Sequence, residues 1–141
     1  MKTYIKHYLL QSVYDVFKNA FEIEIKALAQ PSDDAKLSYA TLNILQQNNI
    51  FPIYVGINSK TISELATVYF GDEEKFSKEE LEDFLKETTN MIVGKMKMLI
   101  SDHDSIAIEL DTPKLIHSLE EDKLNAKKYF KVNGHYIVVA Y

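Results

Sequence analysis

Apolar residues recur at steps of three and four near the start of the chain, which predicts an amphipathic helix over residues 4–20. The same spacing predicts a shorter helix that begins near Lys60 and ends at Gly71, with Ser59 as its N-cap. Both segments mix a continuous apolar stripe with charged positions. They are therefore expected to lie on the surface of a core.

The longest predicted helix begins after Ser77 and ends near Ser101. Ser77 and Glu80 have the spacing of a capping box, in which the hydroxyl and the carboxylate each accept a hydrogen bond from a free backbone N–H. At about 100° per residue, one set of side chains gathers on a single side of this helix. These residues are Leu81, Phe84, Leu85, Thr88, Ile92, Met96 and Leu99. That side is expected to be buried.

Alternating apolar and polar residues, and runs of β-branched and aromatic residues, predict the strands. The predicted strands are residues 21–26, 37–46, 50–57, 106–110, 129–132 and 135–141. The second and third should form a hairpin around residues 47–49, and Asn133-Gly134 should close a hairpin between the last two. Pro52 suggests an edge position or a bulge.

The segments between these elements are predicted to be irregular. Residues 102–104 should form a loop, and residues 114–126 an irregular stretch or a weak helix. The pattern as a whole predicts one domain over residues 1–141 of the α/β (α+β) class. It should hold a mainly antiparallel sheet of about six strands, with two long helices on one face.

Composition and charge narrow the function classes. The chain has 141 residues and no cysteine, which excludes disulfides and a cysteine nucleophile. Its net charge is −5 and its lysines are scattered, so it is not expected to bind nucleic acid. No segment has the length or apolarity of a signal peptide or a membrane span, which predicts a cytoplasmic protein without a membrane partner.

The side of the longest helix opposite its apolar stripe carries the candidate chemistry. Glu87, Asn90 and Gly94 fall there, with Met91 and Met98 along the flank. A carboxylate and a carboxamide three residues apart are neighbours on a helix surface. A glycine inside a helix costs about 1 kcal/mol relative to alanine, so Gly94 indicates either close approach of a partner surface or tight packing within the fold.

The run from Glu87 to Lys97 resembles the E-x-x-N-M-x-x-G-x-x-K helix of the CheC/CheX family of chemotaxis phosphatases. The opening helix, the hairpin over residues 37–57 and the stretch from Ile106 to His117 also follow that family's order. The turn of the first hairpin lacks the glycines that are frequent in the family. The chain is thus similar to that family over nearly its whole length.

CheC-like members carry two E-x-x-N motifs on equivalent helices. In this chain the first helix has Asp15 and Asn19, which are spaced by four rather than three. The single motif at Glu87 and Asn90 therefore resembles the CheX arrangement.

The resemblance implies a phosphatase that hydrolyses the aspartyl phosphate of a CheY-like receiver domain. Asn90 would orient the attacking water and Glu87 would anchor the receiver through a lysine, while Met91, Gly94 and Met98 would form the rim of the interface. The chain would need no cofactor or metal of its own, because Mg²⁺ would belong to the receiver. A homodimer is also expected, by pairing of an exposed edge at the final strand.

Two alternatives stay open at the level of sequence. One is a non-catalytic CheX-like binding module that docks on a receiver or on a component of the flagellar switch. The other is a structural assembly protein of unrelated fold, in which Glu87 and Asn90 belong to an ordinary solvated helix face.

Overall fold

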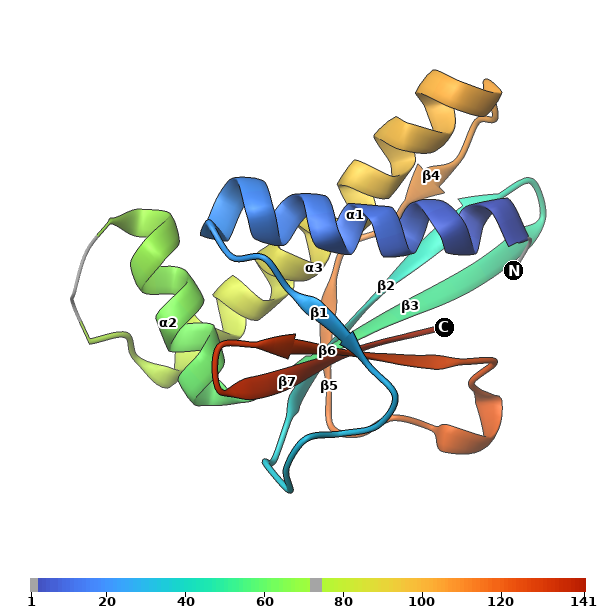
Figure 1. Ribbon diagram of the computed structural model, residues 1–141. Coiled ribbons are helices and arrows are strands. Elements are labelled where there is room, and N and C mark those ends of the chain that lie inside the picture. Colours follow the sequence, from blue (N-terminus) through green and yellow to red (C-terminus); the bar gives the residue numbers. More distant parts are fainter. Residues whose placement is uncertain (1–2, 72–74) are drawn as a thin grey trace.

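One antiparallel sheet forms the centre of the computed structural model, which describes residues 3–71 and 75–141. Its strands are β1 (Lys26–Leu28), β2 (Ser38–Gln46), β3 (Asn49–Ile57), β4 (Glu109–Leu110), β5 (Lys114–Ile116), β6 (Lys127–Val132) and β7 (His135–Ala140). The order across the sheet is β1-β6-β7-β3-β2-β4, and β5 also pairs with β2 (Figure 1). All pairings are antiparallel, as predicted.

Three α-helices accompany the sheet within the described residues: α1 (Thr3–Phe21), α2 (Ser59–Phe70) and α3 (Lys78–Asp104). The long helices α1 and α3 lie on one face of the sheet and contact each other, as Figure 1 shows. No helix within residues 3–71 and 75–141 is long and apolar enough to cross a membrane. The fold is thus the predicted α+β arrangement, with one strand more than expected.

The core lies between the sheet and the two long helices. In β2 the burial alternates, so that Ala40, Leu42 and Ile44 face the core. On α1, Leu9 and Phe17 of the apolar stripe are fully buried against the same core. Period-2 alternation in the strands and the three- and four-residue steps of the helices therefore meet in one cluster.

The predicted hairpins are both present, and their turns follow the local sequence. β2 and β3 pair along their whole length, from Ser38 with Ile57 to Gln46 with Asn49. β6 and β7 are joined through Asn133, whose φ of 54° is the left-handed conformation that this hairpin turn requires. Pro52 lies beyond the segment of β3 that pairs with β7, so its missing N–H removes no bond to that strand.

Several local predictions were wrong. The alternation after Phe21 does not form a strand, because Glu22 adopts a φ of 57° and the chain turns before the short β1. Asn58, rather than Ser59, caps α2, and its side chain accepts a hydrogen bond of 2.7 Å from the N–H of Thr61. Residues 102–104 form the last turn of α3 and are not a loop.

The final strand also occupies a different place from the one expected. β7 lies inside the sheet, between β6 and β3, and Tyr136 to Ala140 are buried. It therefore offers no exposed edge, and the premise of dimerisation through this strand was wrong. The outer positions of the sheet belong to the short strands β1, β4 and β5.

Candidate functional site

The candidate site is on α3, whose 27 residues form a well-anchored rod. The predicted capping box is present: the Glu80 N–H donates to the Ser77 hydroxyl at 3.1 Å, and the Ser77 N–H donates to the Glu80 carboxylate at 3.0 Å. The acidic residues in the first turn also stabilise the helix, because their negative charge interacts favourably with the positive end of the helix dipole. The start of the helix is therefore fixed by local sequence.

The middle of α3 is held by the core. All but one of the predicted apolar-stripe residues are buried, and Leu81 is half-buried. Thr88 and Thr89 lie between Glu87 and Asn90, and their hydroxyls donate to the carbonyls of Phe84 and Leu85, each at 2.9 Å. Because both threonines are buried, they fix the turn that carries the two candidate residues.

Glu87 and Asn90 are both exposed, as predicted. Neither side chain makes a hydrogen bond or an ion pair with the residues that the structure describes. Three residues correspond to about 4.5 Å of helix rise, so the carboxylate and the carboxamide stand one above the other. A rigid backbone thus presents a free amide and a free acid to solvent.

Gly94 faces open space at the surface of the fold. A Cβ built on it would meet no atom within 4 Å, although the residue is in the middle of a packed helix. At Gly56, by contrast, a Cβ would lie 2.5 Å from Cε1 of Tyr39, so that glycine is required by packing. Of the two readings of Gly94 at sequence level, tight packing within the fold is therefore wrong.

A groove of about 280 Å³ runs beside this face, between α1 and α3. Its lining residues are Asp15, Val16, Asn19, Ala20, Met91, Lys95 and Met98. Met98 is 55% exposed, which is high for a large apolar side chain. Two of the predicted interface residues thus line the groove. The contribution of α1 was missed, because Asp15 and Asn19 were considered only as a failed second motif.

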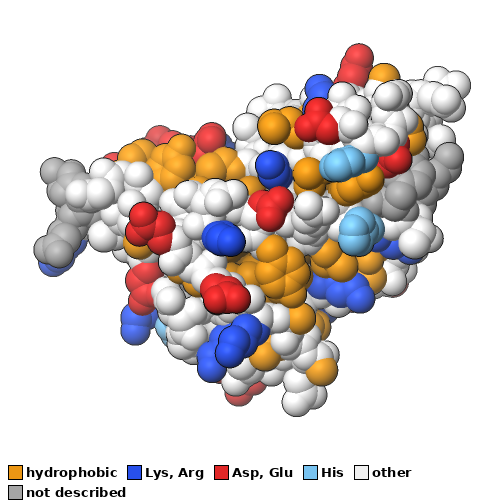
Figure 2. Space-filling model, turned by 45° about the horizontal axis from the view of Figure 1, so that its top comes forward, with side chains coloured by type: hydrophobic (Ala, Val, Ile, Leu, Met, Phe, Trp, Pro, Cys, Tyr) orange, Lys and Arg blue, Asp and Glu red, His pale blue; other side chains and the backbone are white. Residues whose placement is uncertain are grey.

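Charges of both signs surround the candidate pair. Lys86 forms an ion pair with Asp83 at 3.3 Å, while Lys95 and Lys97 make no ion pair with described residues. Figure 2 shows Lys, Asp and Glu side chains interspersed with apolar ones over one face of the molecule. On that face no continuous positive surface is present.

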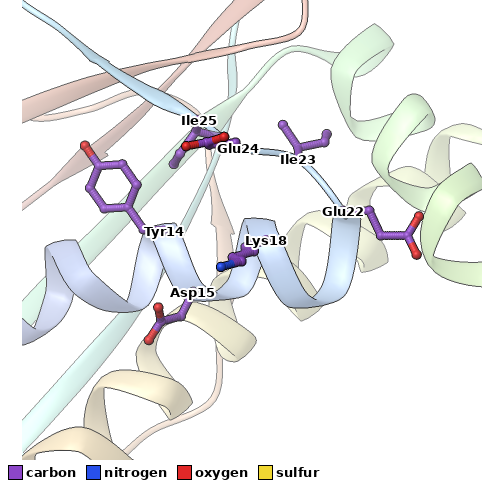
Figure 3. A pocket seen from close by; sticks show the side chains of 7 residues that line it. All are labelled: Tyr14, Asp15, Lys18, Glu22, Ile23, Glu24 and Ile25. Atoms are coloured by element: carbon purple, nitrogen blue, oxygen red, sulfur yellow. The ribbon is translucent and has the colours of Figure 1, made fainter.

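A second and larger hollow, of about 410 Å³, lies along α1 at the segment that leads into β1. Figure 3 shows its lining, with Asp15 pointing toward α3 and Tyr14, Glu24 and Ile25 on the side of β1. The hollow contains none of the predicted site residues. The phenols of Tyr39 and Tyr136, whose pKa burial raises, lie on β2 and β7 and not on α3.

Comparison with known proteins identifies the fold. A family model described as "Chemotaxis phosphatase CheX" matches residues 47–132, which include the whole of α3. A comparison with curated proteins finds no match.

Solved structures of similar fold cover nearly the whole chain. The chemotaxis protein CheX from Vibrio vulnificus is 16% identical with a TM-score of 0.79, covering 99% of this chain and 97% of that one. A chemotactic CheC-like protein from Shewanella oneidensis is 18% identical with a TM-score of 0.78 and the same coverage of both chains. A CheX–CheY–BeF3–Mg complex from Borrelia burgdorferi is 16% identical with a TM-score of 0.70, covering 96% and 95%. At these identities the likeness establishes the fold.

Proposed function

The chain belongs to the family of the chemotaxis phosphatase CheX, and on this premise we propose that it hydrolyses the aspartyl phosphate of a CheY-like response regulator. The observation that carries the proposal is the exposed pair Glu87 and Asn90 in the middle of α3. The family fold also makes the reading as an assembly protein of unrelated fold wrong. The similar Borrelia burgdorferi protein is seen in complex with CheY, which supports a receiver as the partner.

Asn90 is proposed to position the attacking water. An acyl phosphate is already activated, so catalysis mainly requires a water held in line with phosphorus. The amide oxygen of Asn90 accepts a hydrogen bond from that water, and its NH₂ group donates to a neighbouring polar atom. The water oxygen bonds to phosphorus as the bond to the aspartyl oxygen breaks. Aspartate and inorganic phosphate are released, and the proton of the water passes to phosphate or solvent.

Glu87 is proposed to anchor the receiver. Its carboxylate is exposed one turn before Asn90, and no described residue neutralises it. A lysine on the receiver would pair with it and set the depth at which the amide enters the receiver's site. Such a pair at an interface contributes specificity and association rate.

Met91, Gly94 and Met98 are proposed to form the apolar rim. Methionine adapts its shape to a partner surface, and the absence of a Cβ at position 94 leaves room for the partner's backbone. Mg²⁺ is proposed to be held by acidic residues of the receiver, so this chain would supply no ligand to it.

A phosphatase assay on a receiver domain tests the proposal. A CheY-like receiver from the same organism is phosphorylated with acetyl phosphate, and the loss of phosphate is followed with and without this protein. We expect acceleration by the wild type and none by Asn90→Ala. Ser101→Ala is the control, because Ser101 is exposed on α3 and three turns away. Unchanged acceleration by a folded Asn90→Ala variant would refute the role of the amide.

The alternative of a non-catalytic binding module is an outcome of the same assay. It predicts tight binding of the phosphorylated receiver with no faster loss of phosphate. A homodimer remains a further proposal, and the sheet edges formed by β1, β4 and β5 are where it would form. Light scattering that shows a monomer over a wide concentration range would contradict the dimer.

A further inference from the structure

The exposed strip of α3 is too small to hold a receiver by itself. A stable protein–protein contact buries about 800 Å² on each partner and involves about 20–30 residues on a side. The strip offers only a single row of side chains, at Asp83, Glu87, Asn90, Gly94 and Lys97. A partner that covers Asn90 must therefore extend over one flank of the helix.

The two flanks of the strip differ. On one flank Thr89 and Val93 are buried, and Lys86 is only partly accessible and is paired with Asp83. On the other flank Met91 and Met98 remain accessible and open onto the groove between α1 and α3. Accessible apolar side chains beside a functional pair favour this second flank as the direction of contact.

The groove lies between the later turns of α1 and the middle of α3. Ser12 is fully buried, whereas Asn19, two turns later on the same side of α1, is exposed. Val16 and Ala20 line the α1 wall of the groove, opposite Met91 and Met98. The space between the helices is thus large enough for apolar side chains of a visitor and is mostly apolar in its lining.

We propose that the receiver straddles α1 and α3 and inserts an apolar side chain into this groove. The inference rests on the proposed function and adds α1 to the docking surface. Asp15, on the α1 wall, supplies a second carboxylate across the groove from the α3 strip, so the receiver should present lysines to both helices. No residue that lines the groove is proposed to contact the water held by Asn90. The contacts in the groove are therefore made equally in the ground and transition states and lower KM without raising kcat.

Asn19→Trp tests the groove, because the larger side chain would occupy it. With the phosphorylated receiver as substrate, we expect KM to rise about tenfold, the loss of roughly one well-packed anchor, with kcat unchanged. The matched control is Gln11→Trp, which places the same side chain on an exposed position of α1 that does not line the groove. A KM that is unchanged in Asn19→Trp, or raised equally in Gln11→Trp, would overturn the inference.

Asp15→Lys tests the same docking surface independently if the Asn19→Trp variant fails to fold. We expect a higher KM at low salt and a smaller difference at high salt, because charge repulsion is screened. An Asp15→Lys variant with wild-type KM at both salt concentrations would overturn the inference. If the wild type does not accelerate loss of phosphate, the proposed function fails, and calorimetric titration of the receiver against the same variants still tests the groove.

Discussion

The two long helices lie side by side on the same face of the sheet, yet they differ in what they present. α3 carries an exposed acid and an exposed amide three residues apart, at Glu87 and Asn90. α1 also carries an acid and an amide, four residues apart at Asp15 and Asn19, and there the acid is half-buried in the groove. Since both spacings bring side chains together on a helix, spacing alone does not separate the two helices.

The two pairs differ in the exposure of the acid and in the direction in which the side chains point. The pair on α3 projects away from the fold, whereas Asp15 and Asn19 look across the groove toward Met91 and Met98. A pair that faces another helix cannot enter a pocket of a second protein. The comparison supports the proposal that α3 carries the catalytic pair and that α1 contributes to recognition.

Removing the amide from each helix should give the largest contrast. Asn90→Ala is expected to lower kcat for receiver dephosphorylation on the order of 100-fold, because the water loses its positioning group. Asn19→Ala is expected to leave kcat at the wild-type value, because its amide does not reach the reacting water. Phosphate-release kinetics at saturating receiver measure both, and equal losses in the two variants would erase the distinction.

Reversing the charge of the anchor should give the next largest effect. Glu87→Lys is expected to raise KM about tenfold or more, because a lysine then faces the lysine of the receiver. The increase should shrink with added salt. Glu79→Lys is the control, since Glu79 is exposed in the first turn of the same helix and outside the strip. A comparable KM increase in the control would mean that only the net charge of α3 matters.

Loss of the N-cap of α3 should lower the stability of the fold and leave the catalytic rate unchanged. Ser77→Ala removes the hydroxyl that accepts from the Glu80 N–H, and we expect the free energy of unfolding to fall by about 1 kcal/mol. Urea unfolding followed by circular dichroism measures the change. Because Asn90 lies more than three turns further along the helix, kcat should be unaffected. A large loss of kcat in the folded variant would show that the cap also positions the site.

Substitution of Gly94 by alanine should give the smallest effect of this series. It distinguishes an effect on the stability of the fold from an effect on docking of the receiver. Gly94→Ala is expected to raise the free energy of unfolding by up to about 1 kcal/mol, because alanine favours the helix and a Cβ there meets nothing within 4 Å. KM for the receiver should rise at the same time if the partner approaches this position. Gly56→Ala is the contrast, expected to destabilise the fold through the Tyr39 ring. Lower stability of Gly94→Ala would contradict the open space seen there.

Features that depend on neighbouring residues could be predicted from the sequence. The capping box at Ser77, the turn at Asn133 and the outward direction of Glu87 and Asn90 all follow from spacing within one element. The fold of the family was predicted from the resemblance of the run Glu87 to Lys97 in the same helix. The roles of Glu87 and Asn90 in catalysis remain predictions.

Features that depend on how elements meet could not be predicted. The groove depends on how α1 and α3 pack against each other, and residues 12 and 19 look equivalent on a helical wheel. The central place of β7 depends on the order of strands, whereas its β-forming residues suit either an edge or the middle of a sheet. Asn58 and Ser59 are both good N-caps, and only the observed turn decides between them.

The central place of β7 has a consequence for how this chain is made. β7 is synthesised after every other strand, yet it joins the β1–β6 side of the sheet to the β3–β2 side. Until it emerges from the ribosome, β3 has no partner on one side and its backbone groups stay open to other chains. Newly made protein should therefore depend on chaperones late in translation, and strains that lack them should accumulate it in inclusion bodies.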